Sequence, residues 1–483
     1  MLKTVLVALL MVLTAATQAQ QWLGFAHSSY GGLHSALYNP AYYANTRLRL
    51  QVGIVGANST ITSNYLQFRG GLSVSDAVDL FTLQGNTIDE ISKSDFGGAL
   101  NAYFNKGKIE ENLNGDVKNI NLNIEARGPF VLFSNDRFGA GLYFRSRAAI
   151  QVNGVSQDLA RLLYRGAGDL PAEQVYRIIS SSSFNLGLNV YHELGAGIGT
   201  RIFNFGPHHV SVGGNLKYLM GIYSINAASE GFTVRPVTED SLVAIDSRLG
   251  FQYVDASYIG KARDILFKPL GRGTGIDAGA IYEYRPADDG EFVPPGYSRH
   301  KLRVGIAVND LGFITYSSSK YVRSFDLISR SGGIAWGGID TLNISQPRDF
   351  ENIASQVFGL KDTKSRFTYL TPAVLNIHAD LHVKGNFYVA VSTVTNLKFR
   401  SAFGLRSFSS YTISPRIEHK IYEVSLPIGV GLSGTAFQLG TFFRVGGFYL
   451  GSDNLASIFG QSLGNSGLDF YVGGYVPLHK KRS

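Results

Sequence analysis

Residues 301–309 have the sequence KLRVGIAVN, in which two kinds of side chain alternate. Every second position holds a branched apolar side chain: Leu302, Val304, Ile306 and Val308. The positions between them hold small or polar residues: Lys301, Arg303, Gly305, Ala307 and Asn309. Because successive side chains of a strand point to opposite faces, this period of two predicts a β-strand with one apolar and one polar face.

The same alternation recurs along the chain. Four further segments show it clearly: 119–127, 137–150, 209–223 and 375–384. In the second of them, Leu142 lies on the apolar face, while Arg145 and Arg147 lie on the other. Weaker candidates bring the predicted number of strands to 14: 48–57, 184–193, 243–254, 276–285, 321–329, 387–396, 422–433, 437–449 and 468–478. Bacterial barrels favour even numbers of strands, which 14 satisfies. A further strand at 61–68 or after Ala402 would change this count.

The composition favours a membrane barrel over a soluble β-sandwich. Glycine (56), phenylalanine (31) and tyrosine (26) are abundant, and charged residues make up only 17% of the chain. The non-apolar face of the alternating segments mixes glycine with charged residues, which fits a polar lumen better than the packed apolar core of a sandwich. The sequence therefore predicts an all-β protein, a transmembrane antiparallel β-barrel of about 14 strands. Short helices are expected in its long connections, at 73–81, 157–180 and 349–360.

The chain begins with the pattern of a secretory signal peptide. A charged start, MLK, precedes an apolar run over residues 4–16 and small or polar residues up to Ala19. The run is shorter than the roughly 20 apolar residues that cross a bilayer as a helix, and no apolar run of that length follows it. We therefore expect cleavage after Ala19 and export to the outer membrane of a Gram-negative bacterium. There the barrel assembly machinery would insert the strands among lipid and lipopolysaccharide.

Several classes of function lack the residues they need. The chain has no cysteine, which excludes disulfides, thiolate metal sites and cysteine nucleophiles. Its net charge of +8 comes without a basic block or a nucleic-acid recognition motif, and attraction to anionic lipid explains the charge equally well. GQSLG at 460–464 matches the letters of a serine hydrolase motif but lacks the preceding strand that the motif requires. We expect neither enzymatic activity nor a cofactor.

The polar faces of the alternating segments supply candidates for the lumen wall. The candidates are Arg145, Arg147, Lys217, Arg303, His378, Asp380 and His382. The last three share one strand face and could bind zinc or iron. Successive side chains would lie roughly 7 Å apart, however, and further ligands would have to come from another strand. A solvated lumen wall is therefore the favoured interpretation.

The charge of this wall allows two interpretations. A row of cations could favour anions, or carboxylates could neutralise it by pairing across strands. The carboxylates on the same faces are Glu125, Asp277, Glu283 and Asp380. In a solvated lumen, Arg145→Ala or Arg303→Ala should leave the barrel nearly intact, because a lumen substitution costs little.

The segment after the signal carries a recognisable motif. It contains SSYGG at 28–32 and ALYNPA at 36–41, which ends in Asn39, Pro40 and Ala41. This Asn-Pro-Ala element resembles the N-terminal segment of FadL-type transporters of hydrophobic compounds and of PorV-like barrels associated with secretion. The greatest similarity is to a family of uncharacterised outer-membrane barrels of that superfamily. GTGIDAG at 273–279, RVGGFY at 444–449 and DFYVG at 469–473 look like its later strands.

The resemblance implies a 14-stranded barrel with an N-terminal plug in the lumen. A barrel of this size leaves an interior that something must fill or use. Asn39-Pro40 favours an extended or turn conformation where a plug would fold back. The expected organisation is a signal peptide at 1–19, a plug segment at 20–46 and the barrel at 47–483.

Two functions fit this organisation. The leading hypothesis is a non-enzymatic channel or transporter for small hydrophobic molecules. The alternative is a structural or secretion-associated barrel that binds other envelope proteins. An apolar pocket near the plug would favour transport, whereas a sealed lumen with exposed apolar loops would favour a partner role.

Overall fold

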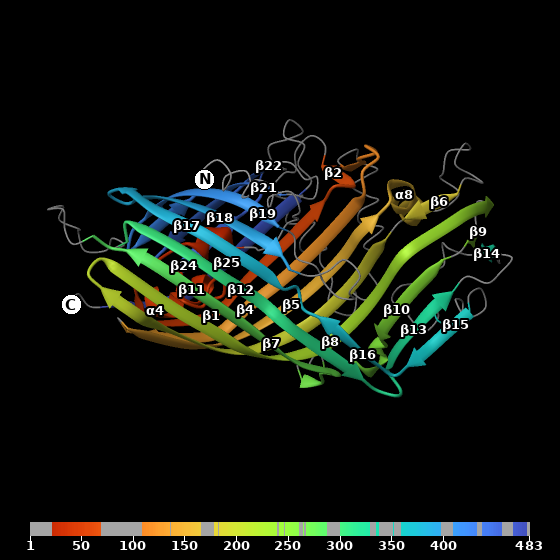
Figure 1. Cartoon of the computed structure of the whole chain (residues 1–483), viewed down its shortest axis with the longest axis horizontal. Coiled ribbons are helices and arrows are strands. Elements are labelled where there is room, and N and C mark those ends of the chain that lie inside the picture. The colour runs from red at the N-terminus through yellow and green to blue at the C-terminus, as the bar shows by residue number, and fades with distance from the viewer. Residues whose placement is uncertain are drawn as a thin grey trace, which may run out of the picture.

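The chain folds into a long antiparallel β-barrel (Figure 1), described here from a computed structural model. The structure describes residues 22–68, 109–135, 137–165, 178–181, 183–238, 241–245, 247–259, 264, 267–286, 300–328, 335–337, 351, 359–397, 409–431, 437–455 and 467–480. The predicted signal peptide, the predicted helix at 73–81, most of that at 349–360 and the GQSLG stretch lie outside these residues.

Fourteen antiparallel strands close the barrel, as predicted. The first seven are β1 (Leu48–Ser63), β4 (Lys118–Ser134), β5 (Phe138–Val155), β7 (Phe184–Phe205), β8 (His208–Thr238), β11 (Gly271–Tyr284) and β12 (Leu302–Ser317). The other seven are β16 (Arg366–Leu370) with β17 (Val374–Lys384), β18 (Phe387–Asn396), β19 (Ser410–Glu418), β20 (Tyr422–Ser425) with β21 (Ile428–Gly431), β22 (Phe437–Leu439) with β23 (Thr441–Val445), β24 (Phe448–Ser452) and β25 (Gly467–His479). The last strand, β25, pairs with β1, Tyr475 opposite Gly53, so that the barrel has no free edge.

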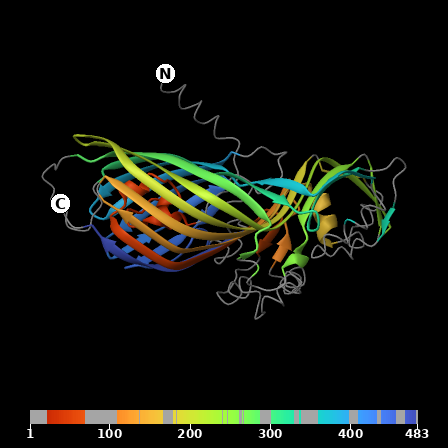
Figure 2. The same ribbon diagram turned by 90° about the horizontal axis from the view of Figure 1, so that it is seen from below.

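A sheet projects beyond the barrel at one end (Figures 1 and 2). Residues 208–221 of β8 pair with β11, whereas residues 225–231 of the same strand pair with β10 (Arg248–Val254). Next in this projecting sheet come β13 (Val322–Ile328) and β15 (Gly359–Lys364), and the shorter β6 (Ile179–Ser181), β9 (Ser241–Ala244) and β14 (Ala335–Gly337) extend it. The connections at this end also hold α8 (Gln157–Arg165), η1 (Ala256–Tyr258) and the β2 (Leu66–Phe68) and β3 (Ile109–Glu111) pair.

The number of strands was predicted correctly, but some of the predicted segments were not barrel strands. Segments 243–254 and 321–329 contain β10 and β13, which belong to the projecting sheet. The stretch after Ala402 contains β19, and 437–449 is divided between β22, β23 and the start of β24. Alternation indicates a strand with one buried and one exposed face. Both the projecting sheet and the barrel wall consist of such strands, so alternation does not distinguish them.

The two ends of the barrel differ in their connections. One end, here the turn end, has short turns at residues 135–137, 206–207, 385–386 and 446–447. Most long connections lie at the other end, the loop end, although residues 285–301 connect β11 to β12 at the turn end. One connection at the loop end contains α8, which covers 157–165 of the helix predicted at 157–180, whereas residues 179–181 form β6. Outer-membrane barrels place short turns on the periplasmic side, which would make the turn end the periplasmic end.

The outer surface of the barrel is apolar. Exposed apolar side chains recur on alternate positions of the strands: Ile54, Leu142, Leu194, Ile198, Leu216, Ile276, Ile306, Val391 and Ile413. Their neighbours along each strand point inward, so Arg145 and Arg303 are buried. In the described residues, no helix has the length and hydropathy to cross a membrane. The apolar band is the lipid-facing surface of a transmembrane barrel.

We expect Leu142→Arg to reduce the fraction of assembled barrel strongly. Leu142 is 57% exposed on the apolar face, and an arginine at mid-membrane costs about 2–4 kcal/mol. Val304→Arg on β12 should also reduce the fraction of assembled barrel. The heat-dependent mobility of the folded barrel in gels of membrane fractions measures the effect. Leu142→Ala is the control because it removes the same side chain without adding charge, and equal folded fractions for both variants would contradict the assignment of faces.

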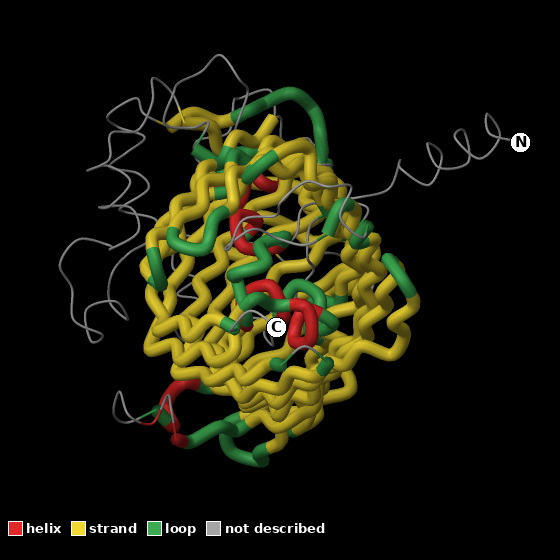
Figure 3. The backbone as a smooth tube through the Cα atoms, turned by 90° about the vertical axis from the view of Figure 1, so that its left-hand side faces the viewer, coloured by secondary structure: helices red, strands yellow, loops and turns green. Residues whose placement is uncertain are grey.

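The N-terminal segment, residues 22–46, lies inside the barrel toward the turn end. Every residue from Trp22 to Thr46 is buried. The segment contains three single-turn helices, α2 (Leu23–Ala26), α3 (Leu33–Ala36) and α4 (Tyr42–Asn45). Figure 3 shows these helices surrounded by the strands.

Candidate functional site

The Asn-Pro-Ala element fastens the N-terminal segment to the barrel wall. The Asn39 side-chain amide donates hydrogen bonds to the carbonyls of Ala280 and Ile306, both at 3.2 Å, and its oxygen accepts one from Ala41 N at 3.1 Å. These wall carbonyls belong to β11 and β12. One side chain thereby ties two strands to the turn that Pro40 makes.

Glycines on the inner face of the wall make room for this contact. A Cβ atom at Gly279 would overlap the Asn39 side chain, and one at Gly213 would overlap the Pro40 carbonyl. Sequence analysis attributed the inward glycines to a polar lumen. The structure shows that several of them face the N-terminal segment, because only glycine lets the two backbones approach so closely.

Polar side chains of the wall also bind the backbone of the segment. Helices of four residues leave most of their backbone groups without intrahelical partners. The wall supplies partners: Gln51 accepts from Leu33 N at 2.8 Å, Asn309 donates to Leu37 O at 2.6 Å, Asn376 donates to Tyr38 O at 3.0 Å, and Tyr475 donates to Tyr30 O at 2.9 Å. Because these partners come from two pairs of adjacent strands, β1 with β25 and β12 with β17, the segment is held at two places in the wall.

Beside the segment lies a central charge cluster from six adjacent strands. Its members are Glu125, Arg127, Arg145, Arg147, Glu193, Lys217, Asp277 and Asp310. Arg145 Nη2 lies 2.5 Å from Glu193 Oε2 and 3.0 Å from Asp310 Oδ1. Lys217 Nζ lies 2.6 Å from Asp277 and 2.5 Å from Asp310. With four cations and four carboxylates the cluster is formally neutral, so pairing across strands describes this part of the lumen better than an anion-attracting row.

Asp310 joins the cluster through a β-bulge. The register between β11 and β12 shifts at this point, and Asp310 has a positive φ of 57°. Its neighbour Asn309 is also buried, so two consecutive side chains point into the lumen. Strict alternation would place Asp310 on the lipid face, which is why sequence analysis missed it.

A turn-end charge cluster surrounds residues 27–30 of the N-terminal segment. Its members are Glu283, Arg285, Arg303, Asp380, Arg416, Glu418, Glu423 and Arg444, again four cations and four carboxylates. Arg416 binds both oxygens of Asp380, at 2.8 and 2.7 Å. Ser28 Oγ donates to Glu423 at 2.7 Å, and Ser29 N donates to Glu418 at 3.2 Å. The cluster therefore holds the segment as well as itself.

The seven predicted lumen residues fall into four environments. Arg145, Arg147 and Lys217 belong to the central charge cluster, and Arg303 and Asp380 to the turn-end charge cluster. The ring of His378 stacks on Tyr42 with centroids 5.9 Å apart. The fourth environment is that of His382, half-buried at the rim, where its Nε2 lies 2.8 Å from Gly385 O. No group of three potential metal ligands occurs within the described ranges.

The structure changes the expected effect of lumen mutations. Arg145 and Arg303 are 4% and 2% exposed, and both are held by carboxylates. Removing a buried partner leaves an uncompensated charge, which is strongly destabilising. The expectation that Arg145→Ala and Arg303→Ala are tolerated assumed a solvated lumen and is therefore withdrawn.

Two histidines of the N-terminal segment are buried in a largely aromatic environment. His34 stacks between Trp22 and Phe25, with ring centroids at 5.2 and 4.7 Å. Burial, and then Arg127, lower the pKa of His34 well below its usual value. Burial, and then His378, do the same for the pKa of His27. Both rings are therefore neutral in the lumen at neutral pH.

We expect acidification to loosen the N-terminal segment. A released histidine binds a proton below about pH 6.5, whereas the buried one does not. The lumen-bound state is thus fully stable above that pH and loses about 1.4 kcal/mol per histidine for each pH unit below it. Protease cleavage of the segment in purified barrels, measured from pH 7.5 to 4.5, should rise on acidification. The double variant His27→Gln, His34→Gln should flatten the profile, and an equal pH dependence would contradict this origin.

Toward the loop end, the inner wall becomes apolar. The apolar lumen layer consists of Ala149, Tyr191, Leu219, Ile314, Tyr316, Phe367 and Tyr369, and Val254 and Val322 at the base of the projecting sheet pack against it. Their strand neighbours Leu194, Tyr218 and Phe313 are exposed on the outer face, which places the layer inside. Tyr316 stacks on Phe367 with centroids 5.1 Å apart. The central charge cluster contacts the layer where Arg147 lies over the Tyr191 ring, at 5.8 Å.

This architecture defines a transmembrane β-barrel of the outer-membrane class, with its own N-terminal segment inside the lumen. The chain belongs to a family of unknown function (DUF5723), whose model matches residues 40–453. Membership in an uncharacterised barrel family, predicted from the Asn-Pro-Ala element and the later strand motifs, is thereby confirmed.

Solved structures with a similar course of the chain include channels and transporters. A deltaS2 mutant of the TodX monoaromatic hydrocarbon channel is 9% identical, with 96% of this chain and 97% of that chain covered and a TM-score of 0.39. The toluene transporter TbuX of Ralstonia pickettii is 10% identical, with 95% of this chain and 99% of that chain covered and a TM-score of 0.37. A FadL homologue of Pseudomonas aeruginosa is 10% identical, with 96% of this chain and 100% of that chain covered and a TM-score of 0.31. Comparison with the sequences of curated proteins finds no match.

Proposed function

We propose that this protein is an outer-membrane channel for small hydrophobic molecules, with residues 20–46 as its plug. Residues 1–19 would direct export, and residues 47–483 would form the barrel. The observation that carries the proposal is the apolar lumen layer, which lies on the loop-end side of the central charge cluster. The channel needs no catalytic residue.

The apolar lumen layer would be out of place in a water-filled porin. Porin lumens are polar, whereas here aromatic and branched side chains of β7, β8, β12 and β16 face inward. Ligand sites for hydrophobic molecules are lined mainly by such side chains, with a few polar groups that orient the ligand. Arg147 over Tyr191 and the central charge cluster provide those polar groups at the inner limit of the layer.

Replacing Leu219 by asparagine tests the channel. Leu219 is 1% exposed and belongs to the apolar lumen layer. Losing most of its apolar surface removes about 1.5–3 kcal/mol of hydrophobic contact, so we expect the variant to bind N-phenyl-1-naphthylamine at least about tenfold more weakly. Fluorescence titration of the purified barrel measures binding. Leu216→Asn is the matched control, since Leu216 lies on the same strand but is 64% exposed on the lipid face. Equal binding by both variants would contradict the proposal.

One observation favours the alternative of a barrel that binds envelope proteins. The sheet formed by residues 225–231 of β8 with β10, β13 and β15 projects beyond the barrel wall (Figures 1 and 2). A transport barrel does not need such an extension, but a partner protein could bind it. If Leu219→Asn left probe binding unchanged while crosslinks to another envelope protein formed on β13, the scaffold function would replace the channel.

A further inference from the structure

Exposed cations lie on the outside of the barrel at its turn end. Each of them is at or beside the end of a barrel strand, and together they form the turn-end cation belt: Arg49, Arg137, Lys301, Lys384 and Lys420. The first two belong to the neighbouring strands β1, β4 and β5, and the other three to the run of paired strands from β12 through β17, β18 and β19 to β20. The belt therefore occupies two arcs of the rim.

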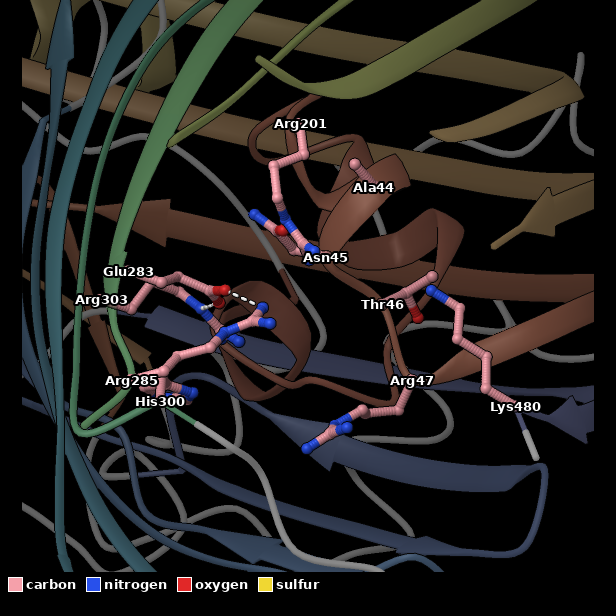
Figure 4. Close-up of a pocket in the computed structure, with 10 residues that line it drawn as sticks. All are labelled: Ala44, Asn45, Thr46, Arg47, Arg201, Glu283, Arg285, His300, Arg303 and Lys480. Atoms are coloured by element: carbon pink, nitrogen blue, oxygen red, sulfur yellow. Dashed lines mark hydrogen bonds and ion pairs between the residues drawn. The ribbon is translucent and has the colours of Figure 1, made fainter. Parts of the chain in front are cut away.

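The positive charge of the belt has no counter-charge beside it. Within the part of the chain that the structure describes, none of the five side chains takes part in an ion pair. The described carboxylates of the turn end are buried in the lumen: Glu283, Asp380, Glu418 and Glu423. There they bind the cations of the turn-end charge cluster, as Glu283 binds Arg285 and Arg303 (Figure 4). An anion for the belt must therefore come from outside the barrel.

The belt borders the lipid-facing surface. Lys384 lies three residues before Phe387, whose ring is exposed on the outer face of β18. Lys420 directly precedes Ile421 and Tyr422, which are exposed as well. In outer-membrane barrels, exposed aromatic side chains at the limit of the apolar band mark the membrane interface. The belt thus lies where acyl chains end and head groups begin, and long cationic side chains can reach the head groups while their stems cover apolar surface.

We propose that the turn-end cation belt binds the phosphate groups of anionic phospholipids in the periplasmic leaflet of the outer membrane. This role goes beyond the channel, because it belongs to the outer surface and not to the lumen. Lysine and arginine near a membrane surface attract anionic lipids through charge, and salt screens the attraction. Lipopolysaccharide also carries phosphates, but it occupies the outer leaflet, so the side of the membrane distinguishes the two sources.

Competition between head groups tests the charge contacts. The complete barrel is reconstituted in phosphatidylcholine vesicles, and spin-labelled lipids measure how strongly each head group associates with its surface. We expect labelled phosphatidylglycerol to associate at least about threefold more strongly than labelled phosphatidylcholine at low salt, and this preference to disappear at high salt. Equal association of the two lipids at low salt would contradict the proposal.

Variants locate the preference on the rim. Three substitutions remove the larger arc: Lys301→Gln, Lys384→Gln and Lys420→Gln. They should lower the preference for phosphatidylglycerol to less than about twofold. If this triple variant fails to fold, Arg49→Gln with Arg137→Gln removes the other arc and should lower the preference in the same direction.

The matched control changes the net charge by the same amount at a different place. It removes three exposed cations of the projecting sheet: Arg235→Gln, Lys361→Gln and Lys364→Gln. Because these residues do not border the lipid-facing band, the preference for phosphatidylglycerol should stay at the level of the parent. An equal loss in the control and the triple variant would mean that net charge, and not the belt, selects the lipid.

A single introduced cysteine identifies the leaflet, since the chain has none of its own. Lys384→Cys should react with a maleimide on a polymer too large for porins only after the outer membrane has been permeabilised. Lys364→Cys on the projecting sheet is the control and should react in intact cells. Reaction of Lys384→Cys in intact cells would place the belt beside lipopolysaccharide and overturn the proposal, as would an unchanged lipid preference in both belt variants.

Discussion

Barrels without residues 20–46 should assemble and conduct ions several-fold better than the parent. The strands close among themselves through β1 and β25, so their backbone hydrogen bonds do not require the N-terminal segment. The segment fills the lumen at the turn end with buried side chains, among them Phe25, Leu33 and Tyr42. Its removal leaves a polar space wide enough for water in a barrel of this size. Single-channel conductance in planar bilayers measures the effect.

A smaller change in the same segment provides the control. Replacing Asn39 and Pro40 by alanine removes the hydrogen bonds to Ala280 and Ile306 and frees the turn, but keeps most of the mass in the lumen. Its conductance should rise less than that of the deletion. A deletion that assembles and conducts no better than the parent would show that the segment is not a plug.

Asp310→Asn should destabilise the barrel more than any exposed ion-pair substitution. Its carboxylate, about 10% exposed, accepts from Arg145 at 3.0 Å, Arg147 at 2.8 Å and Lys217 at 2.5 Å. Removing this charge leaves buried cations undercompensated, which costs about 3–5 kcal/mol. The midpoint of urea unfolding, followed by gel mobility, should fall accordingly.

Asp326→Asn is the matched control for that experiment. Asp326 pairs with Arg248, whose side chain is 69% exposed on the projecting sheet. Pairs of this kind contribute about 0–1 kcal/mol because water screens them. If the two variants had the same unfolding midpoint, the central charge cluster would not be the stabilising element described here.

The sequence predicted the class of fold because its signal is local. In 301–309 and 137–150, alternation assigned Val304 and Leu142 to the lipid face and Arg303 and Arg145 to the interior, and the structure places them there. β19 shows the limit of this reasoning. Ile413 and Ile417 alternate with Arg416 and Glu418, so a signal was present, but its polar residues were not recognised as a lumen face.

The contents of the lumen could not be predicted in the same way. Asp310 enters the lumen only because a bulge in β12 breaks the alternation, and that bulge is defined by the pairing with β11. The turn-end charge cluster joins Glu283, Asp380, Arg416 and Arg444 from four separate strands. No sequence spacing relates these residues.

The alternation in the sequence therefore sets which side chains face lipid and which face inward, since each strand's period of two is set by its own backbone. Which of the inward side chains contact one another depends on how the strands pair and close. Strand register and barrel closure bring together residues hundreds of positions apart, as in the contact of Ser28 with Glu423. The N-terminal segment then excludes water, so that inward charges which the alternation alone would leave solvated become buried pairs.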